Sequence, residues 1–91
     1  MIYHIFKYPI PIIDGIIECK VPRNFRYCDI QVQDNKIYMW CLINNNEKII
    51  TIKLRVFGTG HQIDNPDDYE YLKTVQLDNG DLIFHVFEVI K

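Results

Sequence analysis

Short runs in which apolar and polar residues alternate cover most of this 91-residue chain, and turn-forming residues bound each run. Alternation with a period of two gives a strand one apolar face, whereas a helix needs a period near 3.6. The runs occupy residues 2–8, 16–21, 26–33, 36–43, 49–57, 71–77 and 82–90. They predict a single all-β domain over residues 1–91, built as a small antiparallel sandwich or a partly closed barrel of about seven strands.

The turns between the runs refine this prediction. Asn79-Gly80 and Asp34-Asn35 have the residue types that tolerate the positive φ of tight hairpins. Together with the Asn-rich turn that follows residue 43, the second pair predicts a three-stranded meander over residues 26–57. Pro9 has no backbone N–H, so we expect the first strand to stop at Tyr8.

The alternation also predicts which side chains face the core. On three of the runs the inward residues are expected to be Ile17, Cys19 and Val21, then Cys28, Ile30 and Val32, then Ile50, Ile52, Leu54 and Val56. The run 36–43 is apolar on both faces, so it is either a central covered strand or one exposed toward a partner chain. Because 48% of the residues are apolar, more than one small core can hide, we expect a homo-oligomer.

Composition excludes several classes of function. The chain has no Ser, so a serine nucleophile is excluded, and its net charge of −2 gives no reason to expect non-specific nucleic-acid binding. Basic residues outnumber acidic ones in the first half of the chain, which is a weak indication of a basic patch. This patch would comprise Lys20, Arg23, Arg26, Lys53 and Arg55. No long apolar segment or signal peptide is evident, so we expect a cytoplasmic protein without a membrane span.

The three cysteines, Cys19, Cys28 and Cys41, lack the spacing of a zinc ribbon and are odd in number. All three lie in apolar strand patterns, so buried and inert thiols are expected. A buried thiol stays protonated, which argues against a Cys-His catalytic pair. We therefore expect no catalytic residues, no metal site and no cofactor.

The run from Phe57 to His61 is the most conspicuous short motif. Two glycines around a threonine at a strand end let backbone N–H groups converge, and such a nest can hold a phosphate or carboxylate. Gly58, Thr59, Gly60 and His61 are thus candidate ligand contacts. The alternative is that both glycines only supply the backbone freedom of a turn.

The loop that follows this motif is long and acidic. Asp64, Asp67, Asp68 and Glu70 are typical either of a hard-cation loop or of a solvated loop, and without EF-hand spacing we favour the second. Pro66 can begin a single helical turn capped by Asn65 or Asp64. His85, between apolar neighbours, is more typical of a hydrogen-bonded sheet residue than of a metal ligand.

Aromatic residues are numerous for a chain of this length. Those of interest are Tyr27, Tyr38, Trp40, Tyr69 and Tyr71. If several of them share one outward face, they can stack a base or anchor a protein partner. Otherwise they cover the second face of a thin sheet.

Several segments together resemble a family of short phage and prophage proteins of unknown function. They are Tyr8-Pro9-Ile10, Gln31-Val32-Gln33, Trp40, the run from Phe57 to Ile63, the run from Gln76 to Gly80, and Phe84-His85-Val86-Phe87-Glu88. The chain departs from the family at Cys41, where Ala is common, and at Asn79, where Gly is common. The resemblance implies a viral origin and a small β domain made inside a bacterium, and it implies no activity.

These observations lead to one main expectation about function. The protein is expected to be a non-enzymatic phage accessory protein that counteracts bacterial defence by binding and sequestering a small phosphate-bearing signal. Gly58, Thr59 and Gly60 would contact phosphate, Arg55 and His61 would neutralise it, Trp40 would stack a base, and His85 would support the site. The alternatives are an inhibitor that contacts a host defence protein through Tyr69, Tyr71 and the acidic loop, and a structural or housekeeping phage protein.

Overall fold

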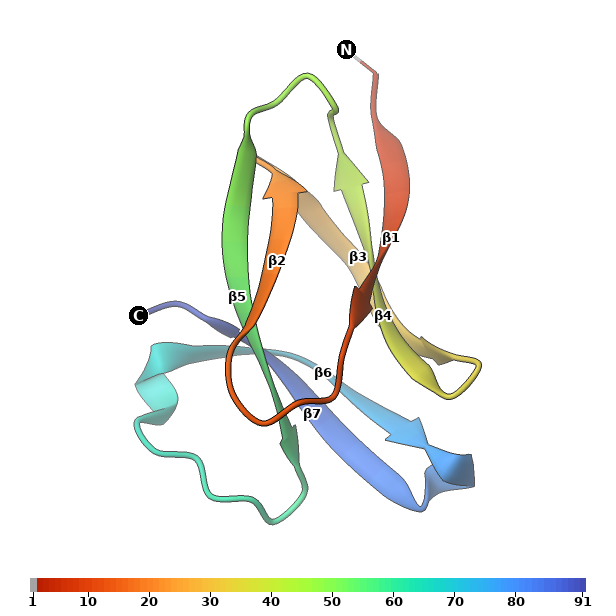
Figure 1. Ribbon diagram of the computed structural model, residues 1–91, viewed down its shortest axis with the longest axis vertical. Helices are drawn as coiled ribbons and strands as arrows, with labels where there is room; N and C mark the ends of the chain where they lie inside the picture. The colour runs from red at the N-terminus through yellow and green to blue at the C-terminus, as the bar shows by residue number, and fades with distance from the viewer. Residues whose placement is uncertain (1) are drawn as a thin grey trace.

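The computed structural model describes residues 2–91 and contains seven β-strands (Figure 1). In chain order they are β1 (His4–Ile10), β2 (Ile17–Pro22), β3 (Arg26–Gln33), β4 (Lys36–Ile43), β5 (Ile49–Gly58), β6 (Tyr69–Leu77) and β7 (Leu82–Val89). Two short 3-10 turns, η1 (Pro66–Asp68) and η2 (Asp78–Gly80), are the helical elements of this part of the chain. The prediction of an all-β domain with about seven strands is confirmed.

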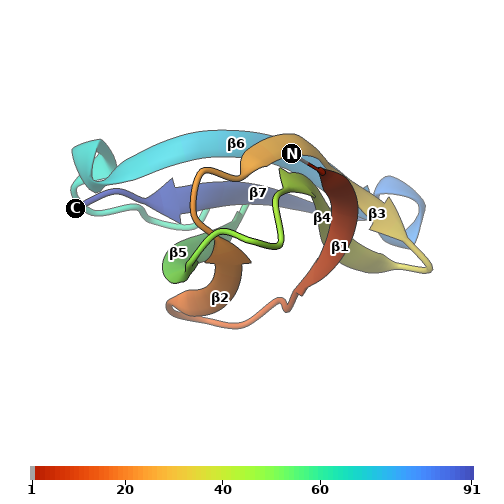
Figure 2. The ribbon, with the colours of Figure 1, turned by 90° about the horizontal axis from the view of Figure 1, so that it is seen from above.

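The strands form two separate antiparallel sheets. Sheet A has the order β1-β4-β3 and sheet B has the order β2-β5-β7-β6. The molecule is thin, with a shortest extent of 16 Å between Cα atoms, and in Figure 2 β6 and β7 run across the view whereas β1 runs down it. The sheets do not close into a barrel, so the sandwich alternative is the correct one.

The predicted meander over residues 26–57 is wrong at its last step. β3 and β4 pair as a hairpin, but β5 pairs with β2 and β7 in the other sheet. The connection crosses between the sheets at buried Asn44, whose side-chain oxygen accepts the Asn46 N–H at 3.0 Å. Alternation shows which side of a strand faces the core, but it cannot show which of the two sheets contains the strand.

Both predicted hairpins are confirmed, and their turns use positive φ as expected. Asp34 and Asn35 have φ of 53° and 59°, and β6 joins β7 through Asp78–Gly80. The helical turn at Pro66 is also confirmed, but the predicted side-chain cap is wrong. Asn65 adopts the left-handed conformation, and its backbone carbonyl accepts the Asp68 N–H at 2.9 Å.

The first strand does not stop at Tyr8, because β1 continues through Pro9 to Ile10. Pro9 is opposite Tyr38 of β4, and β1 is an edge strand of sheet A. An edge strand tolerates proline because one side of its backbone needs no partner strand. Ile10 is 2% exposed, so the extra length anchors the end of β1 in the core.

The core lies between the two sheets and is made largely of β-branched and other aliphatic side chains. The inward residues of β4 are Ile37, Met39, Cys41 and Ile43, and those buried on sheet B include Ile17, Val21, Ile52, Leu54, Val56 and Val86. β4 is the central strand of sheet A, so its inner face is fully covered. Its other face, with Tyr38, Trp40 and Leu42, is half-buried.

A β-bulge in β3 overturns the prediction for Cys28. The register shifts between Tyr27, which is opposite Cys41, and Asp29, which is opposite Trp40. Cys28 is the extra residue, so its thiol is exposed and Tyr27 is half-buried instead. Cys19 and Cys41 do lie inward, and burial raises the pKa of the Cys41 thiol to about 12.

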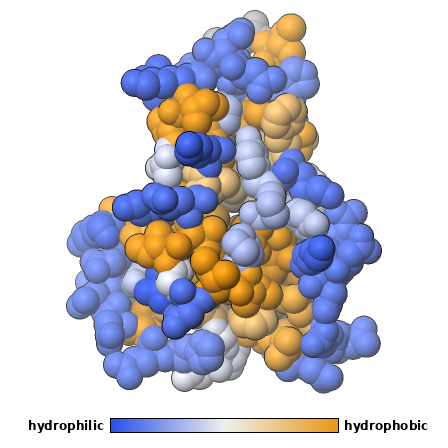
Figure 3. Space-filling view, viewed as in Figure 1, coloured by the Kyte–Doolittle hydropathy of each residue, from blue (hydrophilic) through white to orange (hydrophobic). Residues whose placement is uncertain are grey.

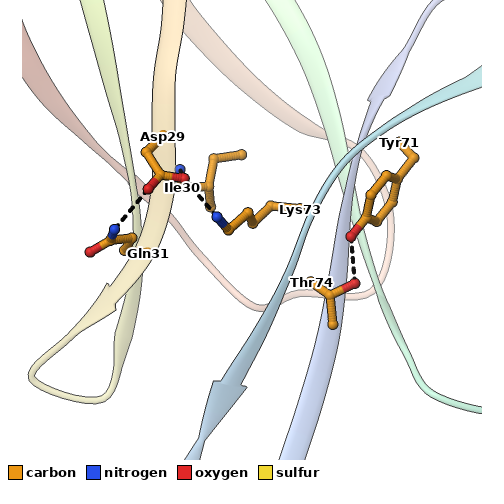
Figure 4. A network of polar contacts seen from close by, with 6 residues as sticks. All are labelled: Asp29, Ile30, Gln31, Tyr71, Lys73 and Thr74. Atoms are coloured by element: carbon orange, nitrogen blue, oxygen red, sulfur yellow. Dashed lines mark hydrogen bonds and ion pairs between the residues drawn. The ribbon is translucent and has the colours of Figure 1, made fainter.

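The two sheets are linked along the line where β3 of sheet A faces β6 of sheet B, here called the β3/β6 seam. The Lys73 ammonium lies 2.9 Å from the Asp29 carboxylate, as Figure 4 shows. At one end of the seam the Asn35 side chain both donates to the Asp78 carboxylate and accepts the Asp78 backbone N–H. These contacts hold the hairpins β3-β4 and β6-β7 together.

Candidate functional site

The outer face of sheet B brings together more of the predicted site residues than any other surface. Directly paired residues on neighbouring strands have side chains on the same face. Phe57 of β5 is opposite His85 of β7, and His85 is opposite Thr74 of β6. Two residues along β5 and β7, Arg55 is opposite Phe87, and Phe87 is opposite Tyr71 of β6.

A chain of hydroxyl and imidazole groups crosses this face. His85 contacts the Thr59 hydroxyl through Nε2 at 2.8 Å and the Thr74 hydroxyl through Nδ1 at 2.9 Å. The Thr74 hydroxyl also contacts the Tyr71 hydroxyl at 2.7 Å (Figure 4). Both ring nitrogens of His85 are therefore engaged by the protein, which fixes the ring and attaches the Thr59 loop to the sheet.

The loop from Gly58 to His61 does not form the predicted anion-binding nest. The Gly58 N–H donates to His61 Nδ1 at 3.1 Å, and the His61 N–H donates back to the Gly58 carbonyl at 3.1 Å. The Thr59 N–H donates to the Ile83 carbonyl at 3.3 Å. Because these donors are used within the protein, the turn interpretation of the motif is the better one.

Gly58 has a further reason to be glycine. A Cβ atom at this position would lie 2.9 Å from Cε1 of the His61 ring, which is closer than real Cβ contacts allow. Gly60 has φ of 87° and supplies the turn itself. The two glycines thus let the His61 ring fold back over the end of β5.

Arg55 is the group on this face that is best suited to bind an anion. Its guanidinium lies 4.6 Å from the centre of the Phe57 ring, and 24% of its side chain is exposed. Nη1 donates to the Tyr69 hydroxyl at 3.3 Å, and Nη2 lies 3.8 Å from the carboxylate of the fully exposed Asp14. Its Nε is buried and has no hydrogen-bond partner within residues 2–91.

A pocket of about 470 Å³ lies beside this arginine. It is lined by Ile12, Ile13, Asp14, Arg55, Val56, Phe57, Gly58, His61, Gln62 and Phe84. The pocket therefore combines Arg55 and the exposed His61 with apolar side chains from the connection between β1 and β2. Such a mixture of apolar walls and a few polar groups is typical of small-molecule sites.

Next to Arg55 lies a cluster of four aromatic residues, of which two were predicted as candidates. Phe57, Tyr69, Tyr71 and Phe87 contact one another edge-to-face, with ring centres 5.6 to 6.2 Å apart. Phe57 is 6% exposed, whereas Tyr71 is 56% exposed. Tyr69 and Tyr71 were candidates, but Phe57 and Phe87 were missed, although their two-residue spacing from Arg55 and His85 is a visible signal.

Trp40 does not belong to this site, which corrects its predicted role of stacking a base there. It is opposite Lys7 in sheet A, on the face that points away from the core, so the core separates it from Arg55. Its ring contacts Tyr38, and the Lys7 ammonium lies 4.5 Å from the centre of the Tyr38 ring. Of the basic residues, Lys20 and Lys53 share the outer face of sheet B with Arg55.

Other kinds of chemistry find little support in the part of the chain that the structure describes. Among residues 2–91, no three His, Cys, Asp or Glu side chains are placed to hold a metal ion. Burial raises the pKa of the Cys19 thiol as well as that of Cys41, which keeps both thiols protonated near neutral pH. No helix within the same residues is long and apolar enough to cross a bilayer.

The fold and this surface define a small two-sheet β-sandwich with a cationic and aromatic outer face. The chain belongs to a family described as a domain of unknown function, DUF7352, whose model matches residues 1–91. No curated protein and no solved structure matches the chain. The expectation that it belongs to a family of unknown function is thus confirmed.

Proposed function

We propose that this domain binds a small phosphate-bearing ligand of the nucleotide type on the outer face of sheet B, with Arg55 as the anion-binding group. The observation that carries the proposal is the buried Arg55 Nε without a partner. A buried polar group without a hydrogen bond costs about 1–3 kcal/mol, and more when it is charged. A ligand oxygen at this position removes that cost.

The contacts that Arg55 already makes are weak enough to be replaced. The Asp14 carboxylate is 3.8 Å away and fully exposed, so it is solvated and easily displaced. A phosphate can accept from Nε and Nη2 together, which is the paired geometry that arginine favours. His61, exposed on the wall of the same pocket, can donate a further hydrogen bond to it.

The aromatic cluster supplies a surface for the rest of the ligand. Tyr71 and Arg55 are both opposite Phe87, so they are two strand spacings apart, about 10 Å. A nucleotide can span this distance, with its phosphate at Arg55 and its base against the exposed Tyr71 ring. Stacking of a base on an aromatic side chain contributes about 1–3 kcal/mol.

The role we propose is binding without turnover. His85 is held between two threonine hydroxyls, so neither of its ring nitrogens is directed at the pocket beside Arg55. We propose further that the chain is phage-encoded and acts in the host cytoplasm, where it sequesters a nucleotide-type signal of a bacterial defence system. This setting is supported by the resemblance to short phage proteins, and the binding chemistry is supported by Arg55.

Titration calorimetry against a panel of linear and cyclic nucleotides tests the binding proposal. We expect heat from at least one of them, and Arg55→Gln should weaken that binding about 10-fold or more, as expected for loss of a charge-assisted hydrogen bond. Lys53→Gln is the matched control, because Lys53 is on the same strand and face but is exposed. Absence of heat with every nucleotide, or equal weakening by both substitutions, contradicts the proposal.

One observation favours inhibition by direct protein contact as a second candidate. Tyr71 is 56% exposed, and the acidic residues Asp67 and Glu70, which precede it in the chain, are exposed as well, a combination that suits a basic groove on a host protein. Under this alternative, a stable one-to-one complex with a purified host defence protein is lost in Tyr71→Ala and kept in Arg55→Gln. Absence of such a complex, together with nucleotide binding that Arg55→Gln weakens, favours the ligand site.

A further inference from the structure

The outer edge of β1 is a prominent surface that the proposed ligand site does not use. In the part of the chain that the structure describes, β1 is the first strand of sheet A and pairs only with β4, so one side of its backbone faces no other strand (Figures 1 and 2). Apolar side chains are exposed on both of its faces: Ile5 is 60% exposed and Phe6 is 43% exposed. In Figure 3 apolar groups reach the surface near this strand and also near the β1-β2 connection.

The other sheet edges are protected, and β1 is not. β3 and β6 face each other at the β3/β6 seam, and β2 exposes the charged Glu18 and Lys20, a usual protection against strand pairing. The lysine of β1, Lys7, donates to Gln33 at 2.9 Å and lies over the Tyr38 ring. Its charge is therefore directed over its own sheet and away from the open edge.

Pro9 indicates which backbone groups of β1 point to that edge. In an antiparallel strand, successive residues direct their N–H and C=O alternately to the two sides. Proline lacks an N–H and is tolerated on an edge strand where its nitrogen points away from the neighbouring strand. Ile5 and Lys7 are four and two residues before Pro9, so their N–H and C=O groups point to the open edge as well.

We propose that β1 pairs with β1 of a second copy of this chain, antiparallel and about a two-fold axis at Phe6. In this register Ile5 is opposite Lys7 of the partner subunit, and the two-fold axis repeats the contact. The N–H and C=O groups of Ile5 and Lys7 are then satisfied by those of the partner subunit's Lys7 and Ile5. The two three-stranded sheets become one six-stranded sheet.

A second copy fits this edge because the register is self-complementary. Phe6 meets Phe6 of the partner subunit on the inner face, where cross-strand aromatic pairs are stabilising. No two like charges are directly opposite, since each Lys7 faces an isoleucine. The pairing covers the exposed surface of both Ile5 and Phe6, and it accounts for apolar residues that a single sandwich leaves exposed.

Light scattering after size-exclusion chromatography of the full chain tests the proposal through charge at position 5. We expect the wild-type chain to be a dimer and Ile5→Lys to raise the dissociation constant about 10-fold or more, because it places an ammonium group opposite Lys7 of the partner subunit. Ile5→Glu should remain dimeric, since its carboxylate meets that lysine. Ile12→Lys, at a residue 44% exposed outside the edge, should also remain dimeric.

Cross-linking tests the position of the two-fold axis. In the proposed register, Phe6 faces Phe6 of the partner subunit as a pair that is not hydrogen-bonded. The Cα atoms of such a pair are about 4.5 Å apart, within the range of a disulfide. Phe6→Cys should therefore form covalent dimers under mild oxidation far faster than the wild-type chain, whose exposed Cys28 is the internal control. A wild-type monomer at every soluble concentration, a dissociation constant that Ile5→Lys leaves unchanged, or no faster cross-linking of Phe6→Cys overturns the proposal.

Discussion

The two long sides of this sandwich are built in opposite ways. At the β3/β6 seam, Asp29 pairs with Lys73, and beside it the Tyr27 hydroxyl of β3 donates to the Glu88 carboxylate of β7 at 2.6 Å. At the other side, no residue of β1 within the described chain makes a side-chain hydrogen bond or ion pair to sheet B. The side with polar contacts between the sheets needs no second chain. The side at β1 is apolar and open, so it is suited to a partner.

Paired bulges give the seam its geometry. The register of β3 shifts at Cys28, and that of β6 shifts at Leu72. Each bulge immediately precedes one member of the ion pair, so Asp29 and Lys73 are turned toward each other (Figure 4). A bulge bends its strand and redirects the side chains that follow it. Here the two bulges, one in each sheet, direct Asp29 and Lys73 toward each other.

The largest expected difference in stability between the two sides concerns two isoleucines, one on each side. Ile30, next to Asp29 on the inner face of β3, is 3% exposed, whereas Ile5 of β1 is 60% exposed. Ile30→Ala should lower the free energy of unfolding by about 2–5 kcal/mol, because it leaves a cavity in the core. Urea unfolding at a concentration where the chain is monomeric should show a change within about 0.5 kcal/mol for Ile5→Ala. Equal losses would show that the two sides do not differ as described.

The strand pattern and its turns were predictable from the sequence, because alternation and positive-φ residues act locally. The sheet that contains β5 was not, since the turn at Asn44 carries the chain across the core without changing the alternation. The bulge at Cys28 was equally hidden, because one extra residue leaves the composition of the run unchanged. Both failures concern long-range pairing, which a local pattern does not contain.

The candidate site was predictable in part for a similar reason. Thr59 and His85 are in contact, and Arg55 lies on the same face of sheet B, because strands β5 and β7 pair directly. Trp40 does not join them, since it faces outward on the other sheet. The prediction of an anion-binding nest at Gly58 is wrong for a different reason. The His61 ring accepts the Gly58 N–H, which is the group that an anion would need.

A second and smaller effect is expected from the partly buried hydrogen bond between Tyr27 of β3 and Glu88 of β7, beside the seam. Burial and the hydrogen bond to Glu88 raise the pKa of Tyr27, so its hydroxyl remains a donor throughout the range in which the protein is handled. Tyr27→Phe should lower the free energy of unfolding by about 1.5–3 kcal/mol, the range for hydrogen bonds to charged groups. Tyr38→Phe is the control, because its ring is half-buried on sheet A and its hydroxyl makes no hydrogen bond within the described residues. A loss of the same size in Tyr38→Phe would mean that the seam bond contributes nothing specific.

The smallest effect concerns the exposed ion pair and depends on pH. Lys73 first, then Gln31 and the Ile30 N–H, lower the pKa of Asp29 in the folded chain. A carboxyl whose pKa is lowered by folding contributes stability that is present above its unfolded value, about 3.9, and is lost as the pH falls through the folded value. Asp29→Asn should therefore be less stable than the wild-type chain at neutral pH, and the difference should shrink in acid. Thermal unfolding measured from neutral to acidic pH tests this, with Asp81→Asn as control, because the Asp81 carboxylate makes no hydrogen bond or ion pair in the described chain. A difference that persists in acid would show that the ion pair is not what Asp29 adds to the seam.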